Sequence, residues 1–101
     1  MFGFIKKLFG PGTDFKALMA QGAVIIDVRT SGEYGTGHIK GSKNIPLDQI
    51  THKVNEIKKI GKPIITVCRS GARSSMAIGT LKRNGIECYN GGAWNSLINK
   101  I

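Results

Sequence analysis

The hydrophobic positions of this chain follow two different periods. Residues 23–28 and 64–67 are nearly continuous apolar runs, which are typical of strands buried on both faces of a sheet. Residues 47–60 instead carry apolar side chains at spacings of three and four, a pattern that predicts an amphipathic helix. Because strand and helix patterns alternate, the sequence predicts an α/β domain of right-handed βαβ units with a central, mostly parallel sheet flanked by helices.

Shorter signals complete the predicted order of elements. A first helix is expected with Thr13 as its N-cap, and a helical turn is expected at 31–34. A short strand is expected at 43–45 and a last strand at 86–89, followed by a turn at 90–92. These elements occupy the intervals between the stronger patterns, so the whole chain after its first residues is predicted to fold.

Two helices in the C-terminal half are expected to present apolar faces to the core. The first begins near Arg73 and ends at Asn84-Gly85, a common helix stop. The closing helix follows the predicted turn. The side chains expected to face inward are Met76, Ala77, Ile78 and Leu81 in the first helix and Trp94, Leu97 and Ile98 in the second.

Residues 1–12 are interpreted as an N-terminal lead-in, and residues 13–101 as one domain of ordinary size. The lead-in mixes apolar side chains with Lys6 and Lys7. Packing on the domain or fraying is favoured over docking on a membrane surface. The lead-in lacks the long apolar stretch of a signal peptide or a membrane span. Stable membrane insertion is therefore not expected, and a cytoplasmic location is expected.

A cysteine stands where the second apolar run ends and a helix begins. Backbone N–H groups in such a turn converge on one point and, with the positive end of the helix dipole, favour an anion. The pKa of Cys68 is therefore expected to lie below that of an ordinary thiol, about 8.5. A cysteine that packs as a small hydrophobe needs neither Gly71 nor the flanking Arg69 and Arg73. We interpret the loop as a reactive thiolate that meets an anion.

The other loop residues are candidates for binding this anion. Arg73 is expected to direct its guanidinium at an oxyanion above the sulfur. Arg69 either shares this role or points into solvent, and the hydroxyls of Ser70 and Ser74 are available to the anion or to the sulfur. Gly71 is expected to adopt a backbone conformation that other residues resist. The substrate-binding candidates are Arg69, Ser70, Gly71, Ala72, Arg73 and Ser74.

Composition narrows the possible partners and sites. The 101 residues include 15 Lys and Arg against 6 Asp and Glu, a formal net charge of +9 that attracts anions. The basic residues are scattered and do not interleave with aromatic residues, so no nucleic acid partner is expected. Two cysteines make neither a disulfide framework nor a zinc site, so no metal site is expected. No cofactor is expected either. Cys88 is interpreted as a core residue, and a disulfide between it and Cys68 remains open.

Spacing separates two classes of cysteine chemistry. The motif of protein-tyrosine-type phosphatases looks like a cysteine followed by five residues and an arginine, with a histidine before the cysteine. Here four residues separate Cys68 from Arg73, and Val67 precedes the cysteine. The shorter loop has less room for a tetrahedral phosphate, and no carboxylic acid stands out as a proton donor. A phosphatase or an arsenate reductase is therefore the weaker alternative on the same scaffold.

Several motifs, taken in order, resemble the rhodanese family. The motifs are Asp27-Val28-Arg29, Glu33-Tyr34, Gly37-His38-Ile39, Gly41, Asn44-Ile45-Pro46, the loop 68–74, and Gly91-Gly92 with Trp94. Each is weak alone, but the combination spans residues 13–98. The resemblance implies a rhodanese-like three-layer domain and a Cys68 that carries sulfur as a persulfide. It also implies that 68–73 is the six-residue loop of the sulfur-transferring members.

By this resemblance the chain is expected to be a thiosulfate sulfurtransferase. Sulfane sulfur would pass from thiosulfate or a persulfide donor, through Cys68, to a thiol, to cyanide or to a partner protein. Asp27 and Arg29 are interpreted as structural support for the strand end and the loop. A non-catalytic interaction module is a further alternative, although such relatives look like ones that have lost the cysteine. A third alternative, intermediate between an enzyme and an interaction module, is a persulfide carrier that delivers sulfur to one partner protein.

Overall fold

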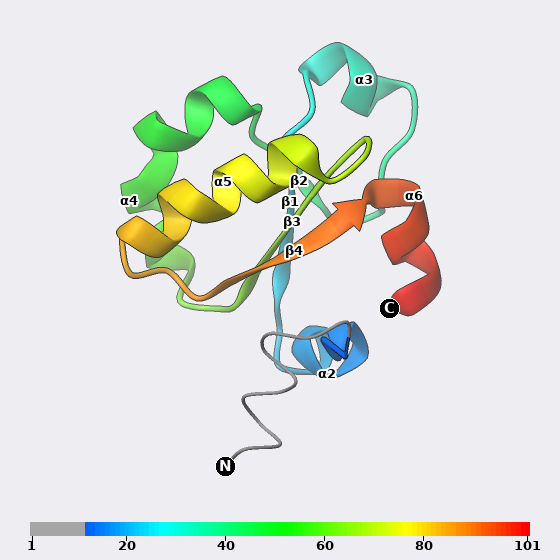
Figure 1. Cartoon of the computed structure of the whole chain (residues 1–101), viewed down its shortest axis with the longest axis horizontal. Helices are drawn as coiled ribbons and strands as arrows, with labels where there is room; N and C mark the ends of the chain where they lie inside the picture. Colours follow the sequence, from blue (N-terminus) through cyan, green and yellow to red (C-terminus); the bar gives the residue numbers. More distant parts are fainter. Residues whose placement is uncertain (1–11) are drawn as a thin grey trace.

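Four parallel strands form the centre of the fold in a computed structural model that describes residues 12–101 (Figure 1). Their order across the sheet is β2, β1, β3, β4, and each neighbouring pair is parallel. The strands are β1 (Val24–Asp27), β2 (Lys43–Asn44), β3 (Ile64–Cys68) and β4 (Cys88–Ala93). The predicted α/β class with a parallel central sheet is confirmed. The predicted lead-in lies outside the described residues, apart from Gly12.

Helices cover both faces of the sheet and produce three layers (Figure 1). The helical elements are α2 (Phe15–Ala20), α3 (Ser31–Gly35), η1 (Leu47–Gln49), α4 (Ile50–Ile60), α5 (Ala72–Arg83), α6 (Trp94–Leu97) and η2 (Ile98–Lys100). Helices α4 and α5 pack on one face, and α2 and α6 pack on the other. Within residues 12–101, no helix has the length and hydropathy that a membrane crossing requires.

The strand β3 supplies side chains to both hydrophobic layers. Ile64 and Cys68 belong to the cluster under α4 and α5, whereas Ile65 and Val67 belong to the cluster under α2 and α6. All four are buried because the strand is covered on both faces, and successive strand side chains point to opposite faces. The continuous apolar run that ends in Cys68 is thus the signature of a central strand.

Side-chain caps define where two of the helices begin. Asp14 is the N-cap of α2, so the expected cap at Thr13 is wrong by one residue. In α3 the hydroxyl oxygen of Thr30 accepts the N–H of Glu33, while the carboxylate of Glu33 accepts the N–H of Thr30. This reciprocal capping box confirms the predicted helical turn at 31–34 and holds the side chain of Glu33 near the start of α3.

Two side chains expected in the core are on the surface instead. Met76 is 63% exposed and Ile98 is 44% exposed. The inward face of α5 is set by three buried residues at helical spacing, and Met76 lies off that face. These buried residues are Ser74, Ala77 and Leu81. A polar serine therefore takes an inward position that apolar periodicity alone would not assign to it.

The last strand is longer than its sequence pattern indicates. It begins at Cys88, two residues after the expected start at 86, and continues to Ala93 through residues 90–92, which were expected to form a turn. A Cβ atom on Gly91 would lie 2.9 Å from the side chains of both Ile65 and Val67, so only glycine lets β4 approach β3 this closely. The register between the two strands shifts at the same point, as in a β-bulge.

The carboxyl ends of β1 and β3 meet at one edge of the sheet. Asp27 lies opposite Val67, the residue before Cys68. Figure 1 shows the loop that follows β3 at this edge, between α3 and α6. Open α/β sheets bind ligands outside the carboxyl ends of their strands. The fold thus brings the predicted loop and Asp27 to the edge where a site is expected.

Candidate active site

Cys68 ends β3 and begins a short loop that leads into α5. The cysteine is only 1% exposed, whereas Arg69 and Ser70 beside it are exposed. The loop turns at Gly71, whose φ of 103° lies in the left-handed region that favours glycine. The thiol therefore lies just beneath the surface of the loop, at the start of a helix.

The sulfur of Cys68 is buried, yet hydrogen-bonding groups surround it. The N–H of Gly71 donates to Sγ at 2.9 Å, and in the thiol form Sγ donates to the Ser74 hydroxyl oxygen at 3.6 Å. Burial raises the pKa of Cys68, but the N–H groups of Ser74, Gly71 and Ser70 and the hydroxyl of Ser74 lower it by more. The pKa consequently lies below its ordinary value. This geometry is consistent with the prediction that N–H groups of the loop stabilise a thiolate at Cys68.

Asn90 of β4 holds the loop in place and was not predicted as part of the site. Its Oδ1 accepts the hydroxyl of Ser74 at 2.6 Å and the N–H of Gly92 at 2.8 Å, and its Nδ2 donates to the carbonyl of Gly71 at 3.3 Å. Ser74 is thereby fixed beside the sulfur. In the sequence Asn90 indicates only a turn, since asparagine is common in turns.

Replacing Asn90 by alanine is expected to raise the pKa of Cys68, because Gly71, whose N–H donates to Sγ, loses the side-chain amide that positions it. The rate of Cys68 alkylation by iodoacetamide at neutral pH should fall about threefold or more, as a higher pKa leaves less thiolate. The pH dependence of alkylation measures this. Asn84→Ala is the matched control, because the side chain of Asn84 bonds only the carbonyl of Thr80 at the far end of α5. Equal pH midpoints for wild type and Asn90→Ala would contradict the assignment.

Asp27 and Arg29 form a buried ion pair at the end of β1. Nε of Arg29 lies 3.0 Å from both carboxylate oxygens, and one terminal nitrogen lies 2.7 Å from Oδ2. The terminal nitrogens of Arg29 also donate to the carbonyls of Gly37 at 2.7 Å and of Glu33 at 3.2 Å. Asn44 donates to the carbonyls of both Asp27 and Arg29. These contacts tie β1, β2 and α3 together, which favours the predicted supporting role of the pair.

Arg73 pairs with Glu33 of α3. Its two terminal nitrogens lie 2.7 Å and 2.9 Å from the two carboxylate oxygens, a bidentate geometry. The hydrogen bond from Arg73 lowers the pKa of Glu33 to about 2, and Glu33 in turn raises the pKa of Arg73. The sequence did not indicate this partner. The oxyanion contact expected of Arg73 stays a prediction, and Glu33 competes for the same nitrogens.

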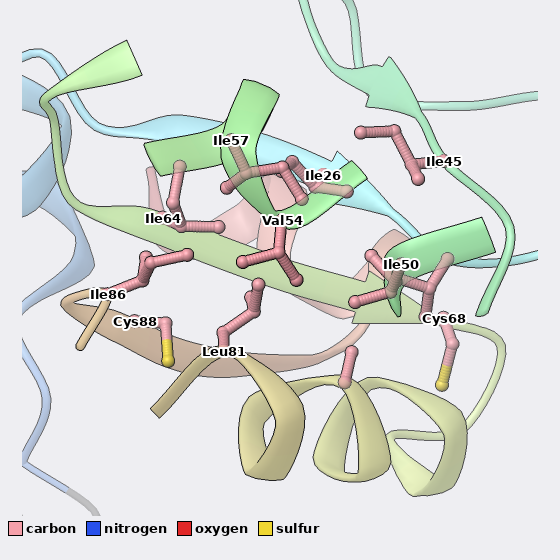
Figure 2. Packing of buried hydrophobic residues seen from close by; sticks show 12 residues of the cluster. Ile26, Ile45, Ile50, Val54, Ile57, Ile64, Cys68, Leu81, Ile86 and Cys88 are labelled. Carbon is pink, nitrogen blue, oxygen red and sulfur yellow. The ribbon is translucent and has the colours of Figure 1, made fainter. Parts of the chain in front are cut away.

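Cys88 lies far from the candidate nucleophile. Figure 2 shows Cys68 and Cys88 at opposite ends of one core cluster. Cys88 lies opposite Ile64, and Cys68 is four residues farther along β3, about 13 Å away. A disulfide needs Cα atoms within about 7 Å, and both cysteines are free. Burial also raises the pKa of Cys88. In this fold the two cysteines do not form the disulfide that the sequence left open.

Comparison with known proteins adds a family context to this geometry. The family model described as "Rhodanese-like domain" matches residues 12–95. The chain is 45% identical over 69 residues to the uncharacterized protein YqhL of Bacillus subtilis, an alignment that covers 67% of this chain and 54% of YqhL. It is 40% identical over 63 residues to YrkF of Bacillus subtilis, whose name proposes a sulfur carrier protein, with 62% and 34% covered.

Solved structures agree with this match. The crystal structure of a rhodanese-like domain protein from Staphylococcus aureus superimposes with a TM-score of 0.68 at 34% identity, covering 83% of this chain and 85% of that chain. The chain thus matches nearly the full length of one solved structure. It spans about half of YqhL and about a third of YrkF.

Proposed function

The chain belongs to the rhodanese-like domain family, and on this basis we propose that it is a sulfurtransferase whose carrier is Cys68. Its thiolate accepts sulfane sulfur from thiosulfate or a persulfide donor and passes it to a thiol, to cyanide or to a partner protein. Family membership and the proposed role of YrkF support sulfur chemistry in general. The environment of Cys68 supports the assignment of the carrier residue.

The first half-reaction loads the cysteine. The Cys68 thiolate attacks the outer sulfur of thiosulfate, a new S–S bond forms, and the original S–S bond breaks. Sulfite leaves with the bonding electron pair, and it is already a stable anion. No strong general acid is therefore needed, in keeping with the pKa of Glu33, which is lowered to about 2 and keeps this nearby carboxyl group ionised. Charge is conserved, because the product persulfide carries the negative charge that Cys68 began with.

The second half-reaction unloads the cysteine. A thiol acceptor attacks the outer sulfur and transfers its proton to that sulfur, while the electron pair of the broken bond returns to Sγ of Cys68. With cyanide as acceptor, thiocyanate leaves and the thiolate is restored. Because sulfite leaves before the acceptor reacts, ping-pong kinetics are expected. The N–H of Gly71 would stabilise the sulfur anion in both half-reactions, and the hydroxyl of Ser74 would do so by turning its proton from Asn90 to the sulfur.

The observation that carries this proposal is the short contact from the Gly71 N–H to Sγ, together with the lowered pKa of Cys68. A cysteine that only fills space needs neither. The net charge of +9 would help to gather an anionic donor. A reducing compartment such as the cytoplasm would keep Cys68 in its free form.

Intact-mass measurement after treatment with thiosulfate tests the proposal. One added sulfur atom is expected on the wild-type chain, and cyanide should remove it as thiocyanate. An aryl phosphate tests the phosphatase alternative on the same sample. Phosphate release without sulfur capture would overturn the proposal in favour of that alternative. The absence of both activities would overturn it in favour of a non-catalytic binding module.

Arg73→Ala and Glu33→Gln are expected to change the KM for thiosulfate in opposite directions. Removing Arg73 should raise the KM about tenfold, because a charge-assisted contact to the donor is lost. Glu33→Gln should lower the KM, since it releases the guanidinium from its carboxylate partner, and glutamine still suits the capping box. Steady-state kinetics with varied thiosulfate measures both. A KM that neither substitution changes would remove Arg73 from donor binding.

A further inference from the structure

A small cavity lies beside the Cys68 loop, between α3 and α6. Its volume is about 270 Å³, and its lining comes from the end of β1, from α3, from the loop and from α6. The lining residues are Arg29, Glu33, Thr36, Arg69, Trp94 and Asn95. Arg69 directly follows Cys68, so the two Cα atoms are about 3.8 Å apart. Cys68 itself is not among the lining residues, so a ligand in this cavity would meet the loop at the residue next to the nucleophile.

The charged groups around the cavity are paired, with one exception. Arg29 is paired with Asp27, and Glu33 is paired with Arg73. Arg69, by contrast, makes no hydrogen bond or ion pair with any of residues 12–101. The cavity thus presents one free positive charge to a ligand, and it carries no uncompensated negative charge from its lining.

Two further lining groups complement that charge. The side chain of Asn95 on α6 also has no hydrogen-bond partner within the described part of the chain, and its amide is available as a donor. Trp94 presents a half-buried ring, whose position is held by the guanidinium of Arg29 at 4.6 Å from the ring centroid. The lining therefore combines a planar cation, an amide and an apolar ring.

From this arrangement we infer that the cavity binds the acceptor of the second half-reaction, and that this acceptor is a small thiol bearing a carboxylate. The guanidinium of Arg69 matches a carboxylate in bidentate fashion, and the amide of Asn95 adds a donor. The carbon chain of the acceptor would lie on the ring of Trp94. This inference rests on the proposed sulfurtransferase function and specifies its acceptor.

Size and charge both favour a small monoanion. Sites for drug-sized ligands enclose about 300–1,000 Å³, so a cavity of about 270 Å³ suits a molecule below drug size. A carboxylate held at Arg69 would anchor such an acid at the loop that carries Cys68, and the inference requires that its thiol reach the outer sulfur from there. That thiol attacks the outer sulfur and gives up its proton to it. The Sγ–S bond breaks, and its electron pair remains on Cys68 as the thiolate.

The test compares 3-mercaptopropionate with its methyl ester, two thiols that differ in the carboxylate charge. Wild-type protein is loaded with thiosulfate, desalted and checked for persulfide by intact mass, and its discharge by each thiol is timed. The acid should discharge the persulfide at least about fivefold faster than the ester. In Arg69→Gln this ratio should fall toward one, and Asn95→Ala should reduce it in part. Arg83→Gln removes an equal charge from the far end of α5 and should retain the ratio.

Trp94 provides a second readout that needs no turnover, because it is the single tryptophan of the chain. Titration with 3-mercaptopropionate should change its fluorescence in the wild type, and Arg69→Gln should weaken this binding at least about fivefold.

An acid-to-ester ratio that survives Arg69→Gln would overturn the inference, as would an equal loss of the ratio in Arg83→Gln. Slower loading by thiosulfate with an unaltered acceptor ratio would reassign Arg69 to the donor. A chain that never forms the persulfide but still binds the acid would refute the proposed function, not the cavity.

Discussion

Serine in place of Cys68 is expected to abolish sulfur capture from thiosulfate, with turnover falling about 10³-fold or more. A serine hydroxyl is not ionised near neutral pH, and its oxygen cannot carry sulfur as a persulfide. The fold should persist, because serine is close to cysteine in size and its oxygen can accept the N–H of Gly71. Thiocyanate formation from thiosulfate and cyanide measures turnover, and intact mass measures the captured sulfur.

Cys88→Ala is the matched control for this experiment. Cys88 lies in the core at the opposite end of the β3–β4 pair, and burial raises its pKa, so its removal should leave one sulfur atom captured per chain. Circular dichroism on both variants separates lost chemistry from lost structure. Sulfur capture by the Cys68→Ser chain at the wild-type level would assign the carrier to another residue and end the present proposal.

Alanine in place of Asp27 is expected to destabilise the domain by about 3–5 kcal/mol, because it leaves the guanidinium of Arg29 buried without its partner. Asp27 is fully buried and Arg29 is 3% exposed, so water cannot replace the lost carboxylate. Domains of this kind are stable by only about 5–15 kcal/mol, so the loss takes a large share of the total. Urea unfolding followed by Trp94 fluorescence measures it.

A double substitution separates the unpaired charge from the loss of packing. Asp27→Ala combined with Arg29→Met removes both charges. The double variant should lose less free energy of unfolding than the sum of the losses in the two single variants. The carbonyls of Glu33 and Gly37 still lose their donor in the double variant, so some destabilisation should remain. A loss below about 1 kcal/mol for Asp27→Ala would contradict the supporting role, since that is the range of an exposed ion pair.

Much of the fold was predictable because its signals are local. The runs before Cys68 and around Asp27 are apolar without alternation, which identifies central strands of a parallel sheet. Residues 47–60 form η1 and α4 as their period indicates. The thiol at the end of β3 and the left-handed Gly71 also follow from neighbouring residues alone.

The mistaken details are those that depend on packing between distant segments. Met76 was expected in the core, but the contacts of α5 with the sheet select the face that contains Ser74. The turn expected at 90–92 belongs to β4, because Gly91 fits closely against β3. Glycine-rich sequence is typical of a turn and of a close strand contact alike, and only the neighbouring strand distinguishes the two.

The sequence by itself determined the order of strands and helices, the position of a cysteine at a strand end, and a family resemblance that the comparisons confirm. The elements and the position of the cysteine depend on side chains that are close in sequence, and the resemblance depends on the order of short motifs along the chain. Only the tertiary structure decided that Arg73 pairs with Glu33, that Asn90 holds Ser74, and that an unpaired Arg69 borders a cavity. Those pairings join residues far apart in the chain, and hydrogen bonds form wherever packing brings a donor to an acceptor, whatever their separation in sequence.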